Sequence, residues 1–63
     1  MSIRFFLYMK ESKRIVSKPM IHKEKANELK EYFNKGNSII EVGYGDYNLK
    51  TGEYSNIHYA KEN

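Results

Sequence analysis

The stretch IIEVGYGDYNLKTGEYSNIHYA, residues 39–60, decides the fold that we expect for this chain. It holds three of the four glycines and four of the six tyrosines. Apolar and polar residues alternate on both sides of a polar segment at 50–53, a pattern typical of two antiparallel strands joined by a turn. Gly52 suits a turn position with positive φ, while Gly43 and Gly45 indicate a bulge or a close backbone approach. We therefore predict a long β-hairpin.

The register of this hairpin depends on the turn. With a two-residue turn, Tyr44 would lie opposite Tyr59 and Gly45 opposite His58. A bulge would shift the register by one residue.

Residues 3–10, IRFFLYMK, alternate with a period of two and predict a first strand. One face is apolar and should meet the core: Ile3, Phe5, Leu7 and Met9. The other face is aromatic and basic: Arg4, Phe6, Tyr8 and Lys10. Arg14–Met20 predicts a shorter second strand, which Pro19 would confine to a sheet edge or terminate.

Residues 23–34, KEKANELKEYFN, predict the single helix. Ala26, Leu29 and Phe33 form one narrow apolar stripe, so we expect the helix to pack on a sheet. Gly36 is expected to end it. The whole chain, 1–63, reads as one small α+β domain: an antiparallel sheet in the order β-β-α-β-β, or β-α-β-β without the second strand, with the helix on one face.

A chain of 63 residues buries a marginal core, and this one has no cysteine that could form a disulfide or a zinc site. Self-association is therefore the expected source of added stability. The net charge of +3 permits an anionic partner. We recognise no signal peptide or membrane span, and predict a cytoplasmic protein without membrane contact.

Catalytic chemistry is not expected. The two histidines, His22 and His58, lack an evident acid partner apart from Asp46, which could approach His58 across the hairpin. No phosphate-binding glycine motif occurs, because Gly43 and Gly45 sit inside a predicted strand. We predict no enzyme activity, no metal and no cofactor.

A single helix covers only one side of a sheet, so we expect the aromatic side to be exposed to solvent and to bind a partner. The residues expected there are Arg4, Phe6, Tyr8, Lys10, Tyr47, Tyr54 and His58. We predict self-association as a homodimer, or contact with another protein, because Tyr, Phe and Arg are enriched at interfaces. The alternative is a single-stranded nucleic-acid-binding module in which the tyrosines stack on bases. The bias toward Lys, Asn, Ile and Tyr resembles short proteins of AT-rich bacteria and their phages, which would imply a phage-type or mobile-element modulator of a host protein.

Overall fold

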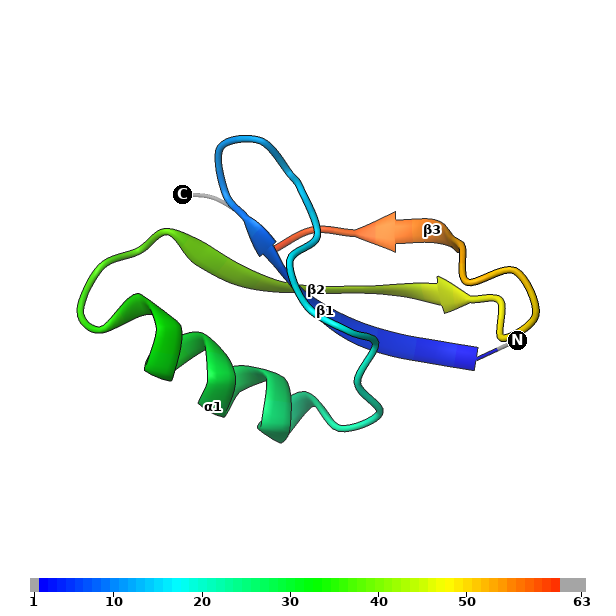
Figure 1. Cartoon of the computed structure of the whole chain (residues 1–63), viewed down its shortest axis with the longest axis horizontal. Coiled ribbons are helices and arrows are strands. Elements are labelled where there is room, and N and C mark those ends of the chain that lie inside the picture. The colour runs from blue at the N-terminus through cyan, green and yellow to red at the C-terminus, as the bar shows by residue number, and fades with distance from the viewer. Residues whose placement is uncertain (1, 61–63) are drawn as a thin grey trace.

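The computed structural model of the protein describes residues 2–60, within which one helix and three strands are found (Figure 1). In chain order these are strand β1 (Ser2–Met9), helix α1 (Lys23–Asn34), strand β2 (Ile40–Tyr47) and strand β3 (Tyr54–His58). The strands form one antiparallel sheet in the order β1-β2-β3. Helix α1 packs on β1 and β2 from one side. The α+β class and the small antiparallel sheet are therefore confirmed, whereas the β-β-α-β-β order is not.

The predicted second strand, Arg14–Met20, is an irregular segment that follows the outer edge of β1. Two isolated bridges join it to that strand: Ile15 with Tyr8, and Met20 with Phe5. Between the bridges, the Ser17 hydroxyl accepts the hydrogen bond from the Leu7 N–H at 2.9 Å, where a regular ladder would use a carbonyl. Pro19 has no N–H to donate. Ser17 and Pro19 therefore interrupt the hydrogen-bond ladder. The order of elements in the protein is the alternative one, β-α-β-β.

Helix α1 has the bounds that the sequence predicts. His22 precedes it in an extended conformation without a side-chain cap. The helix ends where Lys35 turns left-handed, with φ 47°, and Gly36 follows with φ 90°. The Lys35 N–H donates to the carbonyl of Glu31 at 3.1 Å, which satisfies one of the carbonyls that a helix end leaves free.

Asn34 fastens the end of α1 to the start of β2. Its Oδ1 accepts hydrogen bonds from the N–H groups of Ile40 at 2.9 Å and Ile39 at 3.3 Å. Its Nδ2 donates to the Ile40 carbonyl at 3.1 Å. Asn34 is only 9% exposed, so water has little access here, and its side chain provides the hydrogen-bond partners that the backbone of Ile39 and Ile40 needs.

The fully buried hydrophobic residues among those described are Phe6, Leu7, Tyr8 and Ala26. Leu7 lies on the side of the sheet that meets α1, and Ala26 is the buried residue of the predicted helix stripe. Phe6 and Tyr8 alternate with Leu7 along β1 and therefore point to the other side. The sheet is thus covered on both faces, although the chain has one helix only within residues 2–60.

Candidate functional site

The aromatic face of β1, expected to be open, is closed by the C-terminal part of the same chain. Phe6 and Tyr8 are 0% exposed. The Phe6 ring packs edge-on against Tyr54 at a centroid distance of 4.9 Å, and the Tyr8 ring packs similarly against Tyr59 at 5.0 Å. The prediction that Phe6 and Tyr8 are exposed to a partner is therefore wrong, because rings from β3 and the residues after it cover them.

Two glycines in β2 allow this closure. Gly43 lies directly opposite Phe6, and a Cβ at this position would stand 2.8 Å from two carbons of the Phe6 ring and 2.9 Å from the His58 carbonyl oxygen. A Cβ at Gly45 would lie 3.1 Å from the Ser55 carbonyl oxygen. The close backbone approach that the glycines predict is therefore present, and it lets β3 curl over the face that carries Phe6.

The Tyr8 hydroxyl closes the far end of this face. It accepts a hydrogen bond from the Ala60 N–H at 2.9 Å. The Lys13 amine lies 5.4 Å from the ring centroids of both Tyr8 and Tyr59, within the range of cation–π attraction. Tyr8 therefore contributes to the protein's own packing through its ring and its hydroxyl.

Tyr54 differs from Tyr8 because its buried hydroxyl has no hydrogen-bond partner among the described residues. Burial raises the pKa of Tyr54 above its ordinary value of 10.0; the neighbouring Tyr47 raises it further, and Arg4 opposes the shift. The Tyr47 and Tyr54 rings lie 4.9 Å apart. Arg4, Tyr47 and Lys10 are all half-buried. The accessible surface on this side of the sheet is therefore limited to the edges of the buried aromatic cluster.

His58 lies on the opposite side of the sheet from its predicted place. It pairs with Tyr44 across the strands, and the two rings are stacked at 4.6 Å with an interplanar angle of 7°. The register is irregular between Tyr44 and Asp46, and Asn56 adopts φ 50°. The turn is longer than two residues, because Tyr47 pairs with Tyr54, two positions from the register that a two-residue turn would give. The bulge moves the register back by one, which pairs Tyr44 with His58 and turns His58 toward the helix side.

Asp46 makes a different contact from the one predicted with His58. The Asp46 carboxylate instead accepts a hydrogen bond from the Asn56 side chain at 3.0 Å. Within residues 2–60, no group of three or more His, Cys, Asp or Glu side chains is placed to hold a metal ion. In the same range, no helix has the length and apolar character needed to cross a bilayer.

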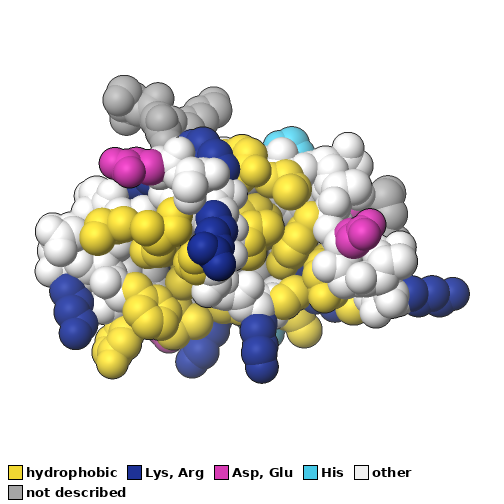
Figure 2. All heavy atoms as spheres, turned by 45° about the horizontal axis from the view of Figure 1, so that its top comes forward, with side chains coloured by type: hydrophobic (Ala, Val, Ile, Leu, Met, Phe, Trp, Pro, Cys, Tyr) yellow, Lys and Arg dark blue, Asp and Glu magenta, His cyan; other side chains and the backbone are white. Residues whose placement is uncertain are grey.

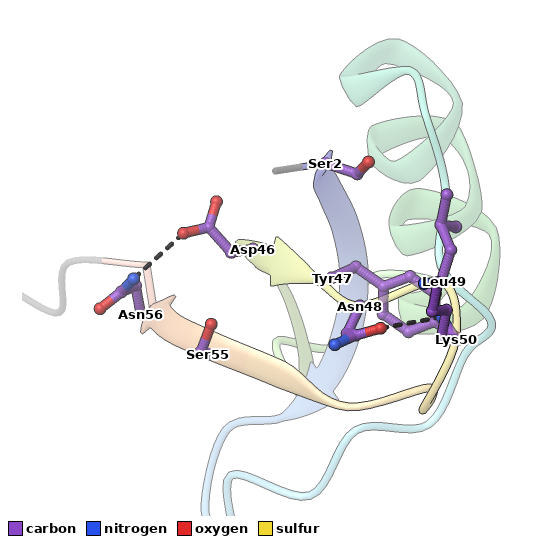
Figure 3. A pocket seen from close by; sticks show the side chains of 8 residues that line it. All are labelled: Ser2, Asp46, Tyr47, Asn48, Leu49, Lys50, Ser55 and Asn56. Atoms are coloured by element: carbon purple, nitrogen blue, oxygen red, sulfur yellow. Dashed lines mark hydrogen bonds between the residues drawn. The ribbon is translucent and has the colours of Figure 1, made fainter.

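A polar hollow lies at the turn between β2 and β3 (Figure 3). The Asn48 side chain bends back on the turn, and its Oδ1 accepts from the N–H groups of Lys50 at 2.8 Å and Thr51 at 3.2 Å. The Asp46–Asn56 hydrogen bond forms another part of its wall. These polar side chains already bond within the hairpin, Asn48 to the turn and Asp46 to Asn56 across the strands, which indicates a structural role.

The surface feature with more binding potential is an apolar groove between α1 and the segment along the edge of β1. We call it the apolar groove, and its lining residues are Leu7, Met9, Val16, Phe33, Ile39 and Ile40. Phe33 is 56% exposed and Val16 is 48% exposed. Tyr32, 66% exposed, extends the apolar surface, because its ring packs edge-on against Phe33 at 5.4 Å.

Phe33 departs from its predicted burial because of how α1 sits on the sheet. The residue of the last turn that is buried is Asn34, whose three hydrogen bonds to Ile39 and Ile40 direct that side of the helix inward. The Lys30 amine, on the same inward side, lies 3.5 Å from the Glu41 carboxylate on β2. Phe33 is left at the flank of the helix, where it lines the groove.

The space-filling view shows hydrophobic side chains in a broken band across one face, with Lys and Arg side chains projecting between them and fewer acidic ones (Figure 2). None of the seven predicted site residues lines the apolar groove. The signal in the sequence that could have located it was the isoleucine pair that follows the helix, at 39 and 40, beside an aromatic pair at 32 and 33.

Comparison with protein-family models, with curated proteins and with solved structures found no match to this chain. The assignment of a function therefore depends on its own residues.

Proposed function

We propose that this is a small non-catalytic interaction protein, and that it binds another protein chain through the apolar groove. The observation that carries the proposal is the exposure of Phe33, Val16 and Ile39, each about half accessible, around a concave apolar surface. Single exposed hydrophobic residues are ordinary, but a contiguous concave group of them marks contact sites.

The energetics fit a contact site of modest size. Full burial of a Phe or Ile side chain is worth about 1.5–3 kcal/mol, so covering the exposed halves of several such residues supplies a few kcal/mol. An aromatic residue at the centre of a desolvated pocket is the usual anchor of such a contact. Phe33 is the aromatic residue that lines the groove and could be desolvated by a partner, and Tyr32 beside it offers both a ring and a hydroxyl.

The nucleic-acid alternative has less support. Two of the rings it would use for stacking on bases, Phe6 and Tyr8, are fully buried. His58 is exposed, but it already stacks on Tyr44. Titration with fluorescent single-stranded oligonucleotides at low and high salt tests this alternative, because phosphate contacts weaken steeply with salt.

The experiment that tests the proposal compares Phe33→Ser with Leu49→Ser. Both remove an exposed apolar side chain, but Leu49, 68% exposed, lies outside the groove at the turn between β2 and β3. Sedimentation measures self-association, and capture from a lysate of the source cells, with and without nuclease, measures binding of other chains.

We expect Phe33→Ser to abolish the association that is found, and Leu49→Ser to leave it intact. Equal behaviour of the two variants, or no association of any kind, would refute the proposal.

A further inference from the structure

Building on the proposed function, we infer that the occupant of the apolar groove is an acidic segment of another protein, with two or three apolar side chains flanked by Asp or Glu. The inference goes beyond the location of the site, because it names the chemistry of the partner. It stands on the charges that surround the groove.

The first side of the groove is the segment along the edge of β1. Arg14, Val16 and Lys18 are exposed there, whereas the residues between them, Ile15 and Ser17, are half-buried. Alternating exposure of this kind is typical of an extended segment that turns every second side chain outward. Val16 lines the groove, so a cation stands on each side of it along the chain.

The second side is the flank of α1. Lys25 precedes Leu29 by four residues and Tyr32 by seven, which places the three on one side of the helix. The Lys35 amine lies 5.8 Å from the centroid of the Tyr32 ring. Glu28, four residues before Tyr32, is a carboxylate on this side of the helix, and the Glu31 carboxylate lies 4.0 Å from the Lys30 amine. The four cations named on the two sides of the groove, Arg14, Lys18, Lys25 and Lys35, therefore face one carboxylate, that of Glu28, that is not accounted for by a lysine.

The floor of the groove adds no compensating negative charge. Its residues are apolar, and the nearby Glu41 carboxylate is paired with Lys30 at 3.5 Å. A ligand with acidic residues beside its apolar ones would therefore meet complementary charges at both margins, which favours encounter and selects against basic partners. A second copy of this chain would bring like charges to the same margins, and each chain carries a net charge of +3.

The test is selection of binding peptides from a random displayed library on the wild-type protein, with counter-selection on Phe33→Ser. We expect the enriched peptides to carry net negative charge together with apolar residues. Fluorescence anisotropy then measures the dissociation constant of an enriched peptide at low and high salt. Phe33→Ser should weaken binding at least about tenfold, as the loss of an aromatic anchor does.

The double variant Arg14→Glu, Lys18→Glu probes the charges alone and keeps the apolar lining. It should weaken binding by about tenfold at low salt, with a smaller effect at high salt, because salt screens exposed charges. Leu49→Ser is the matched control and should bind as the wild type does. Circular dichroism of each variant verifies that it is folded.

Basic or neutral enriched peptides, or an affinity that the charge reversal leaves unchanged, would overturn the inference. Failure to enrich any peptide, together with dimers that Phe33→Ser disrupts, would also overturn it and leave the proposed function standing, with a second copy as the occupant. If neither peptides nor any protein bind through the groove, both fall.

Discussion

Because the aromatic face is closed, we predict that the single methyl group added by Gly43→Ala lowers the stability of the protein substantially. The new Cβ would lie 2.8 Å from the Cε1 and Cζ atoms of Phe6 and 2.9 Å from the His58 carbonyl oxygen. Carbon atoms in good contact are about 3.5–4.0 Å apart, so the ring or the strand must move by most of an ångström. The ring is fully buried against Tyr54, and the oxygen belongs to the backbone of β3, so neither moves freely.

The expected cost follows from two opposing effects. Overpacking of a buried site costs about 1–3 kcal/mol, and the upper part of that range applies where backbone is involved. Alanine also restricts the unfolded chain, which returns about 0.4–1 kcal/mol. We therefore expect Gly43→Ala to lower the free energy of unfolding by about 2 kcal/mol, a large fraction of the roughly 3–9 kcal/mol that a chain of this length has.

Urea unfolding followed by tyrosine fluorescence measures this cost, and the chain has six tyrosines and no tryptophan to interfere. Phe6→Leu provides the internal control, because a smaller side chain relieves one of the two clashes. In that background the cost of Gly43→Ala should fall by about 1 kcal/mol. If Gly43→Ala is as stable as the wild type, or if its cost is the same in both backgrounds, then the Phe6 ring does not occupy the space above Gly43.

Three further substitutions test the polar contacts. Tyr8→Phe removes the acceptor of the Ala60 N–H and should cost about 1 kcal/mol; an unchanged urea midpoint would contradict this bond. Tyr54→Phe removes an unpaired buried hydroxyl and should be neutral or stabilising by up to about 1 kcal/mol. Because the pKa of Tyr54 is raised in the folded chain, its ionisation above pH 10.0 favours unfolding, so stability should decline less between pH 9 and 11 in Tyr54→Phe than in the wild type; equal declines would show that the hydroxyl is not buried. Asn34→Ala leaves the N–H groups of Ile39 and Ile40 without that acceptor and should cost about 2–3 kcal/mol in the same urea assay; a loss below 1 kcal/mol would mean that water replaces the side chain.

The elements that the sequence predicts well are those set by neighbouring residues. The helix bounds, the hairpin and the positive φ of Gly52 all match, because periodicity and turn chemistry act over a few residues. The predicted second strand does not form a regular ladder, because a single hydroxyl, that of Ser17, replaces a backbone acceptor in its middle.

The candidate site was predicted poorly because faces are set by contacts between distant residues. One irregularity between Tyr44 and Asp46 moves His58 to the other side of the sheet, and the curl of β3 over Gly43 and Gly45 encloses Phe6. The number of helices could not predict this closure, because a strand can also cover a sheet face where glycines allow its backbone to approach closely. The rotation of α1 that exposes Phe33 likewise follows from the contacts of Asn34 with residues beyond the helix.

The hydrogen bond between the Tyr8 hydroxyl and Ala60 spans 52 positions of the chain. During synthesis on the ribosome, β1 emerges first, yet the residues that shelter its rings are among the last of the described chain to appear. Helix α1 can form locally at an earlier stage, but the two aromatic side chains of the nascent β1 stay in water until residues 54–60 have also emerged. Because such a distant contact must be closed before the rings are sheltered, we expect this chain to reach its native state more slowly than helical domains of equal length.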